Sequence, residues 1–187
     1  MKRRLTMTLG TAFLISIGGL LLVSGCESPI PNRNPSGEVF PSVSGRDLED
    51  APIDLPSTLR GSSALVLVGY VQGTQFDIDR WMLGMVQSGA DLRMVEVPAV
   101  GGWFPDLFLQ PTIDDGMRAG IPAESWSSVV TLYGEDADQV RRFTGTERPR
   151  NARVLLLDPT GTVAWFWDQG YSPSRLVEML EAADSSD

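Results

Sequence analysis

Residues 65–81 read LVLVGYVQGTQFDIDRW, and this stretch joins two kinds of local structure. The apolar run from Ala64 to Val71 is rich in β-branched residues, which predicts a strand buried on both faces. After the polar break Gln72–Gln75, the sequence predicts a helix over Asp77–Gln87. The apolar residues of this helix recur with the spacing of one buried stripe: Ile78, Trp81, Met82, Met85 and Val86.

Capping residues indicate where this helix begins and ends, and a proline indicates the end of the strand that follows it. Thr74 or Asp77 can cap the first turn, and Gly89 can end the helix in a left-handed conformation. A second strand is expected over Asp91–Val97, closed by Pro98. A strand, a helix and a strand at this spacing predict a parallel pair joined by a crossover.

The C-terminal third predicts a β-hairpin followed by a helix. Arg153–Leu157 and Thr162–Trp167 resemble strands, and Asp158–Gly161 has Pro and Gly where a type I turn favours them. Ser172-Pro173 then supplies an N-cap and a first-turn proline. The helix that follows is expected to bury Leu176, Val177, Leu180 and Ala183.

The remaining segments are less regular. Phe40–Gly61 mixes apolar pairs with Gly and Pro, which favours a small hairpin or an irregular lead-in. Val100–Trp126 is expected to be a long irregular connection with a turn at Gln110-Pro111. Ser128–Tyr133 predicts a strand and Glu135–Phe143 a short helix. The fold class is therefore α/β, in the order β-α-β, connection, β-α, β-β-α.

This order, with a strand ending in D-x-x-G, a hairpin and a closing helix, resembles the thioredoxin-like fold of peroxiredoxins and lipoprotein-tethered reductases. The resemblance implies a three-layer sandwich over residues 39–184, with a central mixed sheet and a C-terminal β-hairpin and helix. In those families the loop after the first buried strand carries the active cysteine, and a cis-proline precedes the final hairpin strand. Here the loop is Gln72–Gln75, and Arg153 stands where the proline is expected.

Five segments carry a closer resemblance: FPSVSGRDL (40–48), LVLVGYVQGTQFDIDRW (65–81), DDGMRAGIP (114–122), VVTLYG (129–134) and VLLLDPTGTVAWFWDQG (154–170). They resemble the thioredoxin-like assembly factors of the mitochondrial ATP synthase membrane sector and their bacterial relatives. The resemblance implies a role in membrane-complex assembly through binding of a protein client.

The N-terminus has the features of an export signal. Three basic residues precede an apolar run over 9–23, and residues 22–26 read LVSGC. This sequence resembles the lipobox of bacterial lipoproteins, which implies a signal peptide over 1–25 and acylation of Cys26 as the first mature residue. An uncleaved membrane anchor is the alternative, since about 17 apolar residues can span a bilayer.

A lipidated Cys26 predicts an exported, membrane-anchored lipoprotein. Residues 26–38 include three prolines and no apolar period, so they are expected to be a structureless tether with a reach of up to ~40 Å. Residues 185–187 are expected to be a disordered tail. Glu27, and not Asp, follows the cysteine, which favours the outer membrane in a bacterium with two membranes.

Composition excludes several classes of function. Cys26 is the only cysteine and the chain has no histidine, so thiol catalysis and Ser-His-Asp or Cys-His devices are excluded and a zinc site is not expected. No catalytic residue, metal or cofactor is therefore assigned. Loss of residues 1–25 removes three of the 15 basic residues and none of the 24 acidic ones, which leaves a net charge of −12. Such a surface repels phosphate, so no nucleic-acid partner is expected.

Two sets of residues are candidates for partner binding. The first is an apolar cluster in the long connection, which either forms an interaction surface or folds back as a lid over the sheet: Trp103, Phe104, Leu107 and Phe108. The second is Gln72 and Gln75, spaced like the cysteines of C-x-x-C. Their amides either hydrogen-bond an extended peptide or satisfy backbone groups at the helix start.

These observations favour a redox-inactive, lipid-anchored thioredoxin-like envelope protein that binds a protein partner and aids membrane-complex assembly. One alternative is a cysteine-independent enzyme derived from a thiol reductase or peroxidase, which turnover of peroxide or disulfide substrates would favour. Another is a structural envelope lipoprotein, which cross-linking without an enriched partner would favour.

Replacement of Cys26 by Ser is expected to abolish labelling with a radioactive fatty acid such as palmitate, because the thiol that carries the lipid is lost. Two or more acyl chains hold a protein stably on a bilayer, so the lipidated wild-type protein should stay in the membrane fraction. Labelling that persists in the variant, or an unchanged mature N-terminus, would rule out lipidation at this residue.

Overall fold

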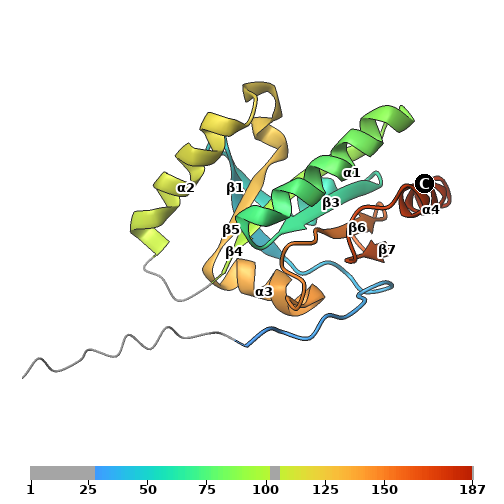
Figure 1. Ribbon diagram of the computed structural model, residues 1–187, viewed down its shortest axis with the longest axis horizontal. Helices are drawn as coiled ribbons and strands as arrows, with labels where there is room; N and C mark the ends of the chain where they lie inside the picture. The colour runs from blue at the N-terminus through green and yellow to red at the C-terminus, as the bar shows by residue number, and fades with distance from the viewer. Residues whose placement is uncertain (1–27, 102–105, 187) are drawn as a thin grey trace, which may run out of the picture.

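The computed structural model describes residues 28–101 and 106–186, and for residues 106–109 it describes the backbone alone. It is a three-layer α/β sandwich around a seven-stranded mixed sheet in the order β2-β1-β5-β4-β3-β6-β7 (Figure 1). The strands are β1 (Val43–Asp47), β2 (Pro52–Leu55), β3 (Ala64–Gly69), β4 (Arg93–Val100), β5 (Val130–Tyr133), β6 (Arg153–Leu157) and β7 (Val163–Trp167). The α-helices are α1 (Gln75–Ser88), α2 (Asp106–Gly120), α3 (Gly134–Thr144) and α4 (Pro173–Asp184), with short 3-10 helices η1 (Ser57–Leu59), η2 (Gln72–Thr74) and η3 (Ala123–Ser128).

The sheet is parallel at its centre and antiparallel toward both edges. β3 pairs in parallel with β4, and β4 pairs in parallel with β5, so the predicted crossover is confirmed. β1 with β2, and β6 with β7, form the two predicted hairpins. Leu65 and Leu67 of β3 pack with α1 and α4, whereas Val66 and Val68 pack with α3. Both faces of the central strand are therefore buried, as its continuous apolar run predicts.

Helix α1 ends as predicted but begins differently. Gly89 is its C-cap, in the left-handed conformation at φ 68°. Thr74 occupies the N-cap position, one of the two predicted, but its side chain makes no capping hydrogen bond to the first turn. The Asp77 carboxylate is buried and accepts hydrogen bonds from the backbone N–H groups of Ala152 (2.9 Å) and Tyr171 (2.7 Å). It joins α1 to the segments before β6 and α4.

The packing of α1 against α4 follows most of the predicted apolar stripe. Trp81 is fully buried and packs edge-on against Trp165 and Tyr171. A Cβ atom at Gly84 would lie 2.8 Å from the Tyr171 hydroxyl oxygen, so the glycine permits this close approach. Val86 and Val177 were expected in the core but are 72% and 54% exposed, because each lies at the margin of its helix's buried face. Leu176, Met179 and Ala183 are the residues that α4 buries.

The connection before β5 contains a helix that the sequence does not predict. α2 spans Asp106–Gly120, with Pro111 inside it, so the predicted turn at Gln110-Pro111 is wrong. Proline and glycine both lower helix propensity, and α2 contains one proline and two glycines, which obscures its period. In Figure 1, α2 lies over the same face of the sheet as α1.

The segment predicted to be a structureless tether is bound to the domain from Ile30 onward. The backbone N–H of Thr146 donates to the Ile30 carbonyl at 2.8 Å, and the Ile30 N–H donates to the Thr146 hydroxyl at 2.9 Å. The Asn32 side chain donates to the Asp168 carboxylate at 2.6 Å. We call residues 30–38 the docked segment. The prediction is wrong for these residues because their polar groups find partners on the domain.

Parts of the predicted organisation lie at or beyond the described ends. The signal peptide and Cys26 are outside the described residues. Ser185 and Ser186, assigned to a disordered tail, hydrogen-bond carbonyl groups in the last turn of α4. Among the described residues, none of the helices has both the length and the apolar content to cross a bilayer.

Arg153 is fully buried at the start of β6, where the thioredoxin-like resemblance places a proline. Its guanidinium lies over the Tyr70 ring, 5.2 Å from the ring centroid. Each of its five N–H groups has an acceptor, so the buried donors are fully satisfied. The acceptors, between 2.8 and 3.3 Å away, are the backbone carbonyl oxygens of Gly145, Arg148 and Asn151 and the side-chain oxygen of Asn32.

Substitution of Arg153 by Met should lower the free energy of unfolding by roughly 3 kcal/mol, since each buried carbonyl that loses its donor costs about 1 kcal/mol. Urea unfolding monitored by tryptophan fluorescence measures the change. Arg150→Met is the matched control, because Arg150 is exposed, and it should cost well under ~1 kcal/mol. Equal effects in the two variants would contradict a stabilising role for the buried guanidinium.

Candidate functional site

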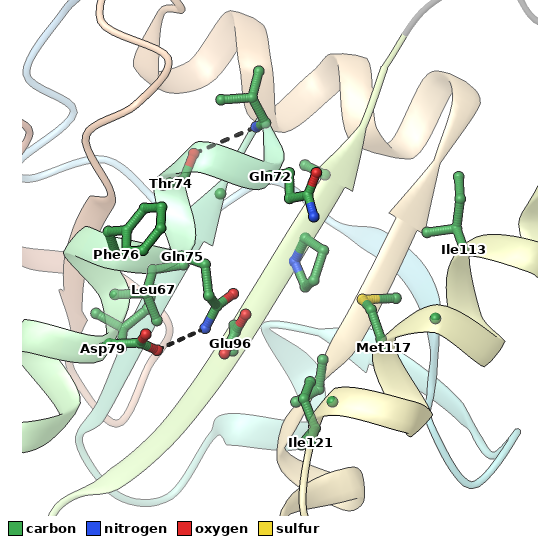
Figure 2. A pocket seen from close by; sticks show the side chains of 18 of the residues that line it. Leu67, Gln72, Thr74, Gln75, Phe76, Asp79, Glu96, Ile113, Met117 and Ile121 are labelled. Carbon is green, nitrogen blue, oxygen red and sulfur yellow. Dashed lines mark hydrogen bonds between the residues drawn. The ribbon is translucent and has the colours of Figure 1, made fainter.

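A groove with a volume of about 1260 Å³ runs over the sheet between α1 and α2 (Figure 2). One wall is formed by η2 and α1, and the opposite wall by α2 and η3. The floor comes from the central strands, with Leu67, Gly69, Met94, Glu96 and Pro98 among its residues. The groove lies beside the carboxyl end of β3, where open α/β sheets commonly bind ligands.

The junction between β3 and α1 is held in place by Thr74. Its buried hydroxyl donates to the Pro149 carbonyl at 2.7 Å and accepts the Val71 N–H at 3.3 Å. The loop that in thioredoxin-like reductases carries cysteines is therefore fixed here by a side chain without redox chemistry. This wall of the groove is preorganised, which lowers the entropic cost of binding.

Gln72 and Gln75 both line the groove, as the partner-binding interpretation expects. Gln72 is exposed at the start of η2, and its carbonyl accepts the backbone N–H of Gln75. The Gln75 side-chain nitrogen donates to the Asp79 carboxylate at 3.0 Å, and its amide group lies beside the Glu96 carboxylate (Figure 2). The Gln75 amide thus bonds a side chain and not a backbone group at the helix start, and it faces the groove (Figure 2).

Glu96 is a buried acid in the floor of the groove that the sequence analysis did not single out. It is 8% exposed, and its strand neighbours Leu67 and Val129 are apolar. Burial raises the pKa of Glu96 above its ordinary value of 4.5; the hydrogen bond from Gln75 opposes this rise, and the nearby charge of Asp79 adds to it. A single acid at an inward position of a strand, within RMVEVPAV (93–100), is the signal that could have identified it.

The α2 wall is also missing from the sequence prediction. Ile113, Met117 and Ile121 point toward the groove in Figure 2, and their spacing of four residues places them on one helix face. Gly116 and Gly120 lie between them and also line the groove. The sequence analysis predicts an irregular connection here, so the helical spacing of these three apolar residues was not recognised.

The predicted aromatic cluster cannot be assigned to the groove. Trp103 and Phe104 lie outside the described residues. Leu107 and Phe108 belong to the first turn of α2, but only their backbone is described. The two predictions for this cluster, an interaction surface and a lid over the sheet, therefore both stay predictions. In the described part of the chain, no group of three or more His, Cys, Asp or Glu is placed to hold a metal ion.

Comparison with solved structures confirms the predicted thioredoxin-like fold. BsSco, of the Sco family of cytochrome c oxidase assembly proteins, matches with a TM-score of 0.58 at 11% identity, over 83% of this chain and 99% of that chain. A SCO1/SenC family lipoprotein from Bacillus anthracis str. Ames matches with a TM-score of 0.54 at 12% identity, over 82% of this chain and 99% of that chain. The exposed lipoprotein thioredoxin Etrx1 from Streptococcus pneumoniae strain TIGR4 matches with a TM-score of 0.51 at 8% identity, over 75% of this chain and 98% of that chain. Identities this low show the fold alone.

No protein-family model matches the chain, and no curated protein sequence matches it.

Replacement of Glu96 by Gln should stabilise the protein at neutral pH. An acid whose pKa is raised by folding binds its proton more tightly in the folded state, so ionisation costs stability as the pH rises above the unfolded value. The variant's gain in melting temperature should be near zero below roughly pH 4 and should reach a few degrees at pH 7 to 8, since 1 kcal/mol corresponds to about 3 °C in a domain of this size.

Glu181→Gln is the matched control for this experiment. It removes the same charge from an exposed position of α4, so its melting temperature should follow the wild type across the pH range. A destabilised Glu96→Gln variant at neutral pH would contradict the burial argument.

Proposed function

We propose that the chain is a redox-inactive, exported and lipid-anchored thioredoxin-like protein that binds a segment of a protein partner in the groove. The observation that carries this proposal is the groove itself, which is larger than the roughly 300–1,000 Å³ of ordinary small-molecule pockets. Its α2 wall presents an apolar helix face and its α1 wall and floor supply polar groups, which suits an extended peptide with anchoring side chains.

Exposed apolar residues at the edge of the groove support binding of a macromolecule. Phe76 is 76% exposed and Val71 is 44% exposed, and both line the groove. Aromatic side chains in such positions provide much of the binding free energy in protein interfaces. The absence of histidine and of a second cysteine in the whole chain supports a binding role over thiol catalysis.

The proposal also includes a more specific role, in which partner binding assists the assembly of a membrane complex. BsSco is described as a member of a family of cytochrome c oxidase assembly proteins, and it shares the fold. The sequence resemblance to assembly factors of the ATP synthase membrane sector points to the same class of activity. The client stays unidentified. Attachment through Cys26 would keep the groove near membrane-bound clients, and the choice of outer membrane rests on Glu27 alone.

The junction between β3 and α1 does not offer the ligands that copper prefers. A structure of yeast Sco1 contains copper, but the junction here offers only the amides of Gln72 and Gln75. Copper prefers thiolate, thioether and imidazole ligands, and amides are poor substitutes. No step of the proposed function therefore involves copper.

Gly116→Trp should block partner binding by filling the groove. A Cβ atom at Gly116 meets nothing within 4 Å, so the new side chain can extend into the groove without a backbone clash. Replacing a helical glycine by tryptophan also removes about 0.5 kcal/mol of unfavourable helix propensity, so the fold should not be lost. Envelope proteins cross-linked to the membrane-anchored protein are then identified by mass spectrometry.

Ala119→Trp is the control, since Ala119 is exposed on α2 and does not line the groove. Loss of partners in Gly116→Trp alone, with an unchanged melting temperature, is the expected result. The same partners recovered with both variants would refute binding in the groove.

A further inference from the structure

The polar centre of the groove consists of acceptor groups without a positive charge. The Gln75 side-chain nitrogen donates a hydrogen bond to the Asp79 carboxylate of α1 at 3.0 Å, and the buried Glu96 carboxylate of β4 lies beside the same amide (Figure 2). A neutral amide therefore lies between two carboxylates. In the described part of the chain, no ion pair is formed by either Asp79 or Glu96.

We propose that the partner segment presents a cationic side chain, arginine or lysine, which enters the groove and pairs with Glu96 and Asp79. This inference rests on the proposed function and names the chemistry of the bound segment. A cation replaces the missing counter-charge in the groove floor, where apolar neighbours weaken solvent screening. Guanidinium in particular can donate to two carboxylates at once.

The surroundings of the two acids define what should flank the cation. Phe76 lies on the same wall as Asp79, and Met117 and Ile121 face them from α2 (Figure 2). These side chains can cover the methylene groups of a long cationic residue and contact its apolar neighbours. The net negative charge of the chain favours the approach of such a segment. The fitting ligand is an extended peptide with a basic residue between apolar ones.

Burial explains why a cation is preferred to a neutral donor. Because burial and the neighbouring Asp79 raise the pKa of Glu96, the free protein holds this carboxylate in an unfavourable ionised form at high pH. A bound cation stabilises the ionised form directly, so binding and ionisation are linked. The groups facing Glu96 are Gln75 and Asp79 from α1, together with Val129 and apolar residues of β3 and α2.

Five pools of fluorescent nonapeptides test the inference, each with a fixed central residue, Arg, Lys, Gln, Leu or Glu, and degenerate flanking positions. Binding to the full-length protein in detergent is measured by fluorescence anisotropy. The Arg and Lys pools should bind about tenfold more tightly than the Gln pool, the gain expected from one desolvated charge pair. Glu96→Gln should remove most of this preference, and Asp79→Asn should reduce it. The matched variant Glu181→Gln should retain it and so exclude attraction by net charge alone.

The outcomes separate the inference from the function on which it rests. Equal binding of all five pools, abolished by Gly116→Trp, would overturn the cation requirement and leave groove binding intact. A preference for the Leu or Glu pool, or an Arg preference that survives in Glu96→Gln, would also overturn it. No binding of any pool, together with unchanged cross-linked partners in Gly116→Trp, would reject both.

Discussion

The five N–H groups of Arg153 set the positions of several segments that otherwise have little to hold them. The side chain is buried, so every donor needs an acceptor within the protein. Three acceptors lie in the irregular loop between α3 and β6, and a fourth is Asn32 in the docked segment. A loop with little regular structure thereby gains a fixed conformation, and the domain gains a stable edge at the start of its final hairpin. Burial lowers the pKa of Arg153, but arginine remains protonated at physiological pH, so its hydrogen bonds persist.

Two buried charges thus serve different purposes on either side of β3. Arg153 has a complete set of partners, and the nearby negative charge of Asp168 favours its charged form. Glu96 has one neutral hydrogen-bond donor and a second negative charge close by. The first arrangement stabilises the fold, whereas the second costs stability in the free protein. Residues that reduce stability in a well-packed floor commonly mark functional sites, because selection has retained them for another reason.

The sequence predicts much of the fold because most of its elements bury clear apolar patterns. The apolar run from Ala64 is continuous, and the hairpin that begins at Arg153 has Pro and Gly in its turn. Both segments form the predicted strands. Helix α2 is the main failure, because Pro111 and two glycines lie within it and lower its local helix propensity. Its described hydrogen bonds to the rest of the domain include those of Arg118 with the Leu48 carbonyl and of Asp114 with the Tyr133 hydroxyl. The candidate site was predicted only at Gln72 and Gln75. Glu96 was missed because one acid in a strand has no local signature until the sheet places it under α1 and α2.

The docked segment limits the distance between the domain and a bilayer to which the chain is anchored. With Cys26 as the lipid-bearing residue, only three residues separate the anchor from Ile30, which is fixed to Thr146. Such a leash reaches at most ~14 Å, against ~40 Å for a tether that is free to residue 38. The volume open to the attachment point falls with the cube of this length, so its effective concentration at the membrane surface rises roughly twentyfold. In the lipid-anchored form that we propose, the short connection would therefore restrict the domain to contacts with the membrane-proximal parts of its neighbours.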